Sequence, residues 1–222
     1  MKLHIASLPL LCLALLAVPA MAGNPPFYDN GPINGNTDAW TINFGFEVSD
    51  TFTVPAGGTQ LTGIAFGAWL FPGDSIPSLS VQVGTGPFGT NEMSLDGVPT
   101  LQLGDCATNN FGFDVCTLSA SWPGLSLAGG TYWITLDNAA VTSGDPVYWD
   151  ENSGAGCGGA GCPSSAQENS VGTIPSEAFT LSGCGGCGCL GAPACAVPEP
   201  SSIMLLGSGI VGLAGVLRRK LF

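Results

Sequence analysis

Two short segments of this sequence each place several side-chain oxygens within one turn-rich stretch. The two sets are Asp29, Asn34, Asn36 and Asp38 near the start, and Asp145, Asp150, Glu151 and Asn152 further along. Carboxylate and amide oxygens are the ligands that calcium prefers in proteins. The second set is therefore the candidate calcium site, although its spacing is not that of an EF-hand loop. The alternative is that both sets are solvated turn residues.

The chain between residues 23 and 197 is acidic and contains no basic side chain. Of the 16 acidic residues only Glu199 lies outside this range, whereas Lys2, the single His4 and the basic residues 218–220 all do. A histidine-assisted nucleophile, imidazole metal ligation and phosphate binding by Lys or Arg are therefore excluded. Nucleic acid is excluded as a partner, because its binding depends on basic side chains.

Carboxylate chemistry remains open, and glycoside hydrolysis needs only an acid paired with a base or nucleophile. Asp150 and Glu151 are nominally available for it. Since neighbours on a strand project to opposite faces, these two are a poor catalytic pair. We therefore expect no enzymatic activity, and we keep a carboxylate-dependent glycoside hydrolase as the alternative.

Eight cysteines follow residue 22. They are Cys106, Cys116, Cys157, Cys162, Cys184, Cys187, Cys189 and Cys195. An even number in an exported chain indicates disulfides. Cys106 and Cys116 flank a turn at 109–112, and Cys157 and Cys162 enclose a Gly-rich loop, so each pair is expected to bond locally. The last four allow three pairings, or a zinc or redox site at their C-x-x-C-x-C spacing.

Two adjacent aromatic pairs, Tyr132 with Trp133 and Tyr148 with Trp149, fall in predicted strands. One member of each pair must point away from the core, because successive side chains on a strand alternate between faces. Exposed aromatic rings can stack on sugar rings, so all four residues are candidate glycan contacts. The alternative is that each outward ring lies beneath a loop.

The elements expected to position these residues are strands. Short runs rich in β-branched and aromatic residues recur between Gly, Pro, Asn and Asp, and no long run has helical spacing. The expected strands cover residues 40–46, 50–54, 60–70, 79–83, 100–103, 114–118, 130–136, 147–149 and 178–181. This number fits an all-β, jelly-roll-like β-sandwich. The first run should place Trp40, Ile42, Phe44 and Phe46 on its core face, and Pro72-Gly73 should form a type II turn.

The two ends of the chain predict export and a membrane helix. Residues 1–22 combine Lys2, an apolar run from Ile5 to Val18 and an Ala20-Met21-Ala22 site, which is typical of a cleaved signal peptide. Near the other end, an apolar run of 15 residues from Ile203 to Leu217 is shorter than the roughly 20 needed to cross a bilayer comfortably. The basic residues 218–220 should stay on the cytoplasmic side.

Val197-Pro198-Glu199-Pro200, the short apolar helix and the terminal basic cluster occur together and in that order. This arrangement resembles the PEP-CTERM sorting signal. The resemblance implies that an exosortase, a membrane-embedded transpeptidase with a catalytic cysteine, cuts the chain near Pro198, Glu199 and Pro200. The expected organisation is a signal peptide at 1–22, a β-sandwich ectodomain at 23–183, a Cys/Gly-rich stalk at 184–197 and the sorting signal at 198–222.

Segments 38–83, 127–133, 144–152 and 174–179 resemble an ectodomain common among PEP-CTERM proteins. The resemblance implies a surface-protein family and adds an association with exopolysaccharide or biofilm, without naming an activity. We expect a non-catalytic protein that is exported across the inner membrane, transiently anchored there, and then displayed at the cell surface or released. Its expected partners are the exosortase and an extracellular polysaccharide.

Overall fold

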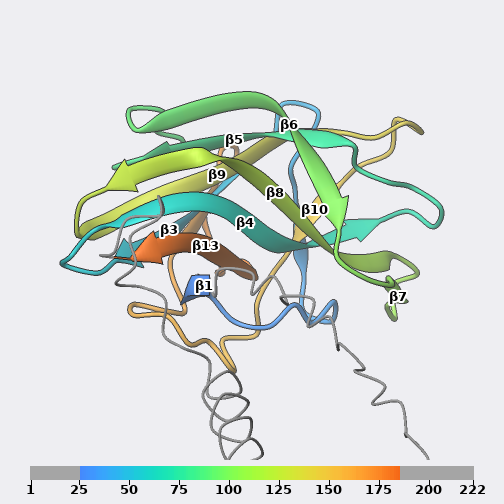
Figure 1. Ribbon diagram of the computed structural model, residues 1–222. Helices are drawn as coiled ribbons and strands as arrows, with labels where there is room; N and C mark the ends of the chain where they lie inside the picture. The colour runs from blue at the N-terminus through green and yellow to red at the C-terminus, as the bar shows by residue number, and fades with distance from the viewer. Residues whose placement is uncertain (1–25, 186–222) are drawn as a thin grey trace, which may run out of the picture.

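The β-rich runs between turn residues become thirteen strands in the computed structural model, which describes residues 26–185 (Figure 1). In chain order these are β1 (Pro26–Asp29), β2 (Ala39–Thr41), β3 (Glu47–Val54), β4 (Thr59–Leu70), β5 (Ser78–Gly84), β6 (Met93–Gln102), β7 (Ala107–Thr108), β8 (Asp114–Leu127), β9 (Gly130–Ala140), β10 (Tyr148–Asp150), β11 (Ala166–Glu168), β12 (Gly172–Ile174) and β13 (Phe179–Gly185). No helix occurs within this range, so the all-β prediction is confirmed. Accordingly, no helix there is long and apolar enough to cross a membrane.

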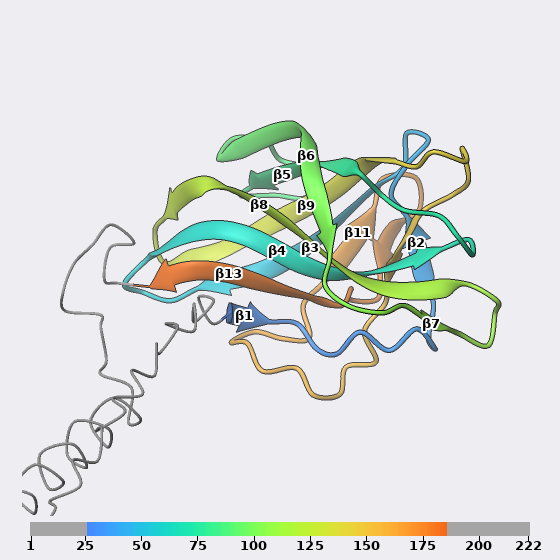
Figure 2. The same cartoon turned by 45° about the vertical axis from the view of Figure 1, so that its right-hand side comes forward.

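The strands form one antiparallel sheet that curls back on itself (Figure 2). Its order is β1-β13-β4-β8-β6-β5-β9-β3-β11-β12, and β10 joins β2 to the end of β4. Strand β6 makes the turn of the curl. Its residues 93–99 pair with β5, and its last three residues pair with β8 in the other half of the sheet. The curled sheet agrees with a sandwich-like arrangement, and a jelly-roll connection of its strands stays a prediction.

The core lies between the two halves of the curled sheet. Its largest fully buried side chains include Phe52 on β3, Phe66 on β4, Trp149 on β10 and Phe179 on β13. Ring contacts connect the halves, since Phe52 on β3 packs edge-on against Phe27 and Tyr28 on β1, in the other half. Most of β4 is buried, as expected for a strand paired with β13 on one side and β8 on the other.

Two local predictions have opposite outcomes. The turn after β4 is confirmed, because the amide of Asp74 donates to the carbonyl of Phe71 at 3.0 Å and Gly73 has a φ of 90°. The expected strand over 40–46 is wrong beyond Thr41. A turn with positive φ at Phe44 and Gly45 ends the alternation, so that Phe44 is 62% exposed.

The other expected strands are confirmed in position, and several are longer than predicted. Strand β8, for example, extends from Asp114 to Leu127 where only 114–118 was expected. The short strands β1, β7, β11 and β12 were not anticipated. The predicted signal peptide, most of the Cys/Gly-rich stalk and the C-terminal helix lie outside the described residues.

Candidate functional site

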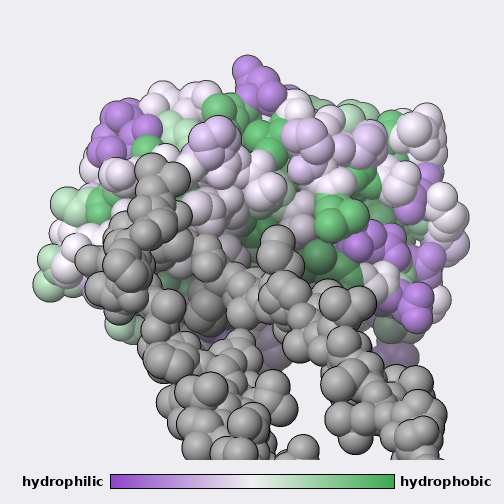
Figure 3. Space-filling model, in the orientation of Figure 1, coloured by the Kyte–Doolittle hydropathy of each residue, from purple (hydrophilic) through white to green (hydrophobic). Residues whose placement is uncertain are grey.

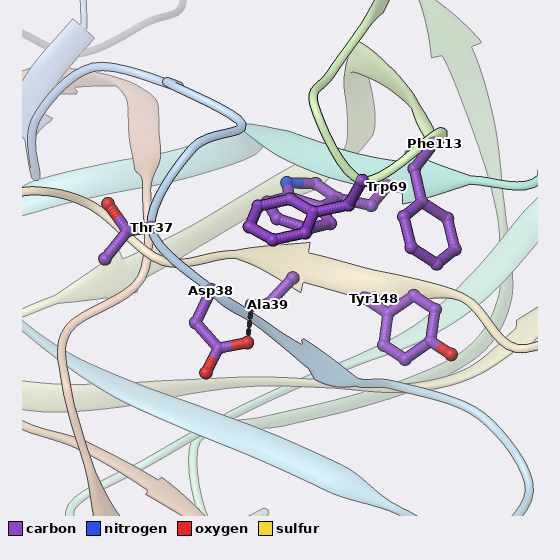
Figure 4. A pocket seen from close by; sticks show the side chains of 7 residues that line it. Thr37, Asp38, Ala39, Trp69, Phe113 and Tyr148 are labelled. Carbon is purple, nitrogen blue, oxygen red and sulfur yellow. Dashed lines mark hydrogen bonds between the residues drawn. The ribbon is translucent and has the colours of Figure 1, made fainter.

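An open pocket of about 390 Å³ lies where the end of β4, the start of β10 and the hairpin between β7 and β8 meet. It is lined by Thr37, Asp38, Ala39, Trp69, Phe111, Phe113 and Tyr148. Figure 4 shows Trp69 in the centre, Phe113 and Tyr148 on one side, and Thr37 and Asp38 on the other. On the face seen in Figure 3, apolar groups reach the surface beside hydrophilic ones on the side where β10 and β7 lie in Figure 1.

Trp69 is fixed at the base of the pocket by a hydrogen bond to a buried carboxylate. Its Nε1 donates to Oδ1 of Asp150 at 2.6 Å, and the amides of Asn34 and Gly35 donate to the same carboxylate at 2.8 and 3.1 Å. Burial raises the pKa of Asp150, and these hydrogen bonds oppose the rise. The indole therefore offers a pocket ligand only its ring.

The aromatic rings of the pocket pack on one another in a row. Phe111 stacks on Trp69 with ring centroids 5.5 Å apart, and Phe113 lies 5.8 Å from Trp69 and 5.5 Å from Tyr148. Phe111 nevertheless remains 60% exposed. An exposed ring held in place by its neighbours provides a flat apolar surface for a ligand at little cost in conformational entropy.

The hairpin that carries Phe111 and Phe113 is closed by two local features. Oδ1 of Asn109 accepts hydrogen bonds from the amides of both phenylalanines, each at 3.0 Å. The disulfide between Cys106 and Cys116 then ties the base of the hairpin to β8. The hairpin is thus cross-linked directly beside the pocket.

The polar groups of the pocket come from the segment that leads into β2 and from Tyr148 on β10. Oδ1 of Asn34 accepts hydrogen bonds from the amides of Asn36 and Thr37, which shapes the turn before Asp38. Asp38 is exposed, and its Oδ1 accepts from the amide of Ala39 at 2.9 Å. Burial raises the pKa of Tyr148, so its hydroxyl keeps its proton at neutral pH.

A second group of carboxylates is buried between β3, β10 and the start of β13. Burial raises the pKa of Asp50 to about 6, against hydrogen bonds from Ser164, from the amides of Glu177 and Thr51, and from Ser176. The pKa of Glu177 is raised well above its usual value, first by burial and then by the charge of Asp50. No basic side chain occurs among residues 26–185 to offset these effects.

The candidate calcium ligands are not brought together as a ready site. Asp150 is fully buried and already accepts the bonds described above, whereas Asn152 donates its amide to backbone carbonyls and to Ser176. Within the described residues, no group of three or more acidic, His or Cys side chains is placed to hold a metal ion. Calcium binding at Asp145, Asp150, Glu151 and Asn152 stays a prediction without support from this geometry.

Both local disulfides predicted from the sequence are present. Cys106 bonds to Cys116, and Cys157 bonds to Cys162 in the Gly-rich loop. The pairing of Cys184, Cys187, Cys189 and Cys195, and the zinc or redox alternative for them, concern side chains outside the described part of the chain.

The four candidate glycan contacts lie in different surroundings. Trp149 is fully buried, and its Nε1 donates to the carbonyl of Ala178 at 3.1 Å, so it cannot touch a surface ligand. Tyr132 stacks on Phe52 against the core, and Trp133 lies on the opposite face of β9. Only Tyr148 lines the pocket.

Sequence reasoning missed the other aromatic members of the pocket, Trp69, Phe111 and Phe113. The available signal was Phe111-Gly112-Phe113, which lies at the end of the predicted turn between Cys106 and Cys116. Such a short hairpin cannot bury both rings in the core, so at least one must lie on the surface.

The geometry also bears on the hydrolase hypothesis. Asp150 is enclosed by donors, and Glu151 is only 7% exposed, so they do not face a common open site. The pocket itself is lined by a single carboxylate, that of Asp38. A carboxylate-dependent glycoside hydrolase is not supported by this arrangement.

The fold and the pocket define an all-β domain with a surface aromatic site. The remaining information comes from the tail, where residues 196–220 match the PEP-CTERM protein-sorting motif. The predicted motif at Pro198, Glu199 and Pro200 is thereby confirmed, and this chain is a protein with a PEP-CTERM sorting signal. The motif implies export and processing by an exosortase. A comparison with curated proteins found no match.

Proposed function

We propose that this chain is a non-catalytic component of the cell surface or extracellular matrix that binds exopolysaccharide through its aromatic pocket. After export and a transient stay in the membrane, an exosortase cuts it near Pro198, Glu199 and Pro200, and it is displayed or released. The observation that carries the proposal is the open row of aromatic rings on a domain that precedes a PEP-CTERM sorting motif.

Stacked, partly exposed rings suit the apolar faces of sugar rings. Phe111 exposes more than half of its surface while Trp69 supports it from behind, so a sugar could stack on it without displacing protein groups. Tyr148 supplies a hydroxyl at the same pocket. Trp133, on the outer face of β9, stays a second contact candidate.

The composition of the pocket favours binding over hydrolysis. Cleaving a glycosidic bond by the usual route requires two carboxyl groups on opposite sides of the bond. Asp38 is the only acidic residue in the lining, and the buried carboxylates are enclosed by hydrogen-bond donors or by the core.

A glycan-binding experiment tests this proposal. The exported protein, purified from its host, is incubated with immobilised and soluble polysaccharides, and both retention and product length are measured. We expect retention without shortening, and loss of retention in Phe111→Ala. Shortened products would show a hydrolase, and absence of retention on every polysaccharide would overturn the binding role.

Processing is tested by mass spectrometry of the protein from the native host, with and without its exosortase. We expect a mature C-terminus near residues 198–200 in the first case and a longer chain in the second. A mature chain still ending in Phe222 would contradict the proposed processing.

A further inference from the structure

We propose that the pocket selects a glycan whose sugar units carry a protonated amine, with the ammonium group against the Asp38 carboxylate and the sugar ring stacked on Phe111. This inference rests on the proposed function and narrows it to one class of polysaccharide, the hexosamine polymers with free amino groups.

The charge of the domain is the first argument. Residues 26–185 contain 15 acidic side chains and no Lys, Arg or His. Glycans rich in uronate, sulfate or phosphate would approach this surface against its field, and nothing in the pocket offers them a positive charge. A polycationic glycan would instead be attracted as it approaches.

The polar atoms of the pocket suit a ligand with several hydrogen-bond donors, which is the second argument. Asp38 Oδ1 accepts only from the amide of Ala39, and no hydrogen bond within residues 26–185 engages its Oδ2. The backbone carbonyl of Asp38 accepts from the amide of Glu151 at 2.9 Å, so the chain that carries this carboxylate is held in place. An ammonium group has three donors and forms a charge-assisted bond with such an acceptor.

The aromatic rings give the third argument. Cations are attracted to the faces of aromatic rings, most strongly to Trp and then to Tyr and Phe. Trp69 cannot serve as a donor to a neutral acetamide group, because its Nε1 is already bonded to Asp150. The pocket thus combines a carboxylate with ring faces, and its side-chain donors are confined to the hydroxyls of Thr37 and Tyr148.

The test compares three soluble oligosaccharides of equal length: glucosamine, N-acetylglucosamine and a polyuronate. Affinities are measured by calorimetry on the exported protein in mildly acidic buffer, where the sugar amines carry protons, and at two salt concentrations. We expect the glucosamine oligomer to bind at least about tenfold more tightly than the acetylated one, and to weaken as salt rises. The polyuronate should not bind.

Asp38→Asn separates the charge from the shape of the site. It should weaken binding of the glucosamine oligomer about tenfold or more, and should leave binding of the acetylated oligomer nearly unchanged. The matched control is Asp96→Asn, which removes one exposed charge on β6, outside the pocket, and should change neither affinity by more than about twofold.

The outcomes distinguish this inference from the proposed function. Equal binding of glucosamine and N-acetylglucosamine oligomers, or equal effects of the Asp38 and Asp96 variants, would overturn the selection for an amine and leave polysaccharide binding intact. Binding of none of the three oligomers, nor of any other polysaccharide, would overturn both.

Discussion

The backbone amide of Glu177 donates a 2.7 Å hydrogen bond to Oδ2 of Asp50, yet the carboxyl group of Glu177 is buried without a hydrogen-bond partner among residues 26–185. The carboxylate of Asp50 thus accepts hydrogen bonds, whereas the carboxyl group of Glu177 beside it makes none with these residues. A buried carboxylate without donors or a counter-ion is costly, so Glu177 is stabilised in its protonated form. The domain therefore contains a pair of buried acids whose charges oppose folding.

The first prediction is that the folded domain loses stability as pH rises from about 4 to above 6. The pKa of Asp50 rises on folding from 3.8 to about 6, and that of Glu177 rises well above 4.5. Between the unfolded and folded values, the unfolded chain has lost protons that the folded chain keeps, so raising the pH favours unfolding. For Asp50 alone the effect is on the order of 2–3 kcal/mol. Urea unfolding at pH 4.5 and 7.5 measures it.

Repulsion among surface carboxylates would also lower the stability of the fold as pH rises. Salt at 1 M screens exposed charges that are more than about 3 Å apart, and it screens buried charges far less. The pH dependence should therefore persist at high salt. A pH dependence that vanishes in salt would show that the surface, not the buried pair, is responsible.

The second prediction concerns Glu177→Gln, which removes the buried charge at nearly constant volume. At pH 7.5 we expect the variant to be more stable than the parent by about 1–2 kcal/mol. At pH 4.5 we expect little difference, because Glu177 of the parent is more protonated there than at pH 7.5, in the folded and in the unfolded chain. Chemical unfolding at both pH values provides the comparison. Glu92→Gln is the control, because Glu92 is partly exposed and should show no such pH-dependent gain.

The third prediction links the Cys106–Cys116 disulfide to the pocket. Replacing both cysteines with Ala should lower the free energy of unfolding by about 2–3 kcal/mol, from the restored freedom of the unfolded loop. It should also weaken glycan binding, since this disulfide closes the hairpin that carries Phe111 and Phe113. The Cys157→Ala/Cys162→Ala pair should lower stability without altering affinity, because that loop does not line the pocket. Equal affinities in both double variants would contradict a positioning role for the first disulfide.

The fourth prediction tests the close packing that holds Asp150 under the pocket. A Cβ at Gly67 would lie 2.7 Å from Cβ of Asp150 and 2.8 Å from Cγ2 of Ile33. Gly67→Ala should therefore destabilise the fold by about 1–3 kcal/mol through overpacking. Gly57→Ala is the matched control, since a Cβ there meets nothing within 4 Å, and it should be neutral or slightly stabilising. Equal melting temperatures for the two variants would contradict the packing argument.

Much of the fold could be predicted from local patterns, because alternation and turn residues act within a few positions. The long buried run in β4, the Pro72-Gly73 turn and the two local disulfides are of this kind. The failure at 40–46 has a physical cause as well. Alternating Ile42, Phe44 and Phe46 suggest a strand, but positive φ at Phe44 and Gly45 reverses the chain, so burial stops at Asn43.

The pocket could not be predicted as a whole from the sequence, because its residues come from four separate parts of the chain. Tyr148 was found because adjacent aromatic residues on a strand must face opposite ways. The sequence places Trp69 in a buried strand, which is confirmed, and only the tertiary structure shows that its ring also lines a pocket with Asp38 and Phe111. The burial of Asp50 and Glu177 was not predicted, because carboxylates are usually exposed and the burial of these two depends on contacts between distant parts of the chain.

The last prediction addresses the bond between Trp69 and Asp150. Trp69→Phe removes the Nε1 donor and keeps an aromatic ring beneath Phe111, leaving the buried carboxylate of Asp150 with its two backbone donors. The loss should cost about 1–3 kcal/mol of unfolding free energy. Trp122→Phe is the matched control, because Trp122 is also buried but its Nε1 has no partner in the described range, so its removal should cost less. Urea unfolding of both variants measures the two losses of unfolding free energy. A cost for Trp69→Phe no larger than for Trp122→Phe would mean that ring packing, and not the hydrogen bond, fixes the base of the pocket.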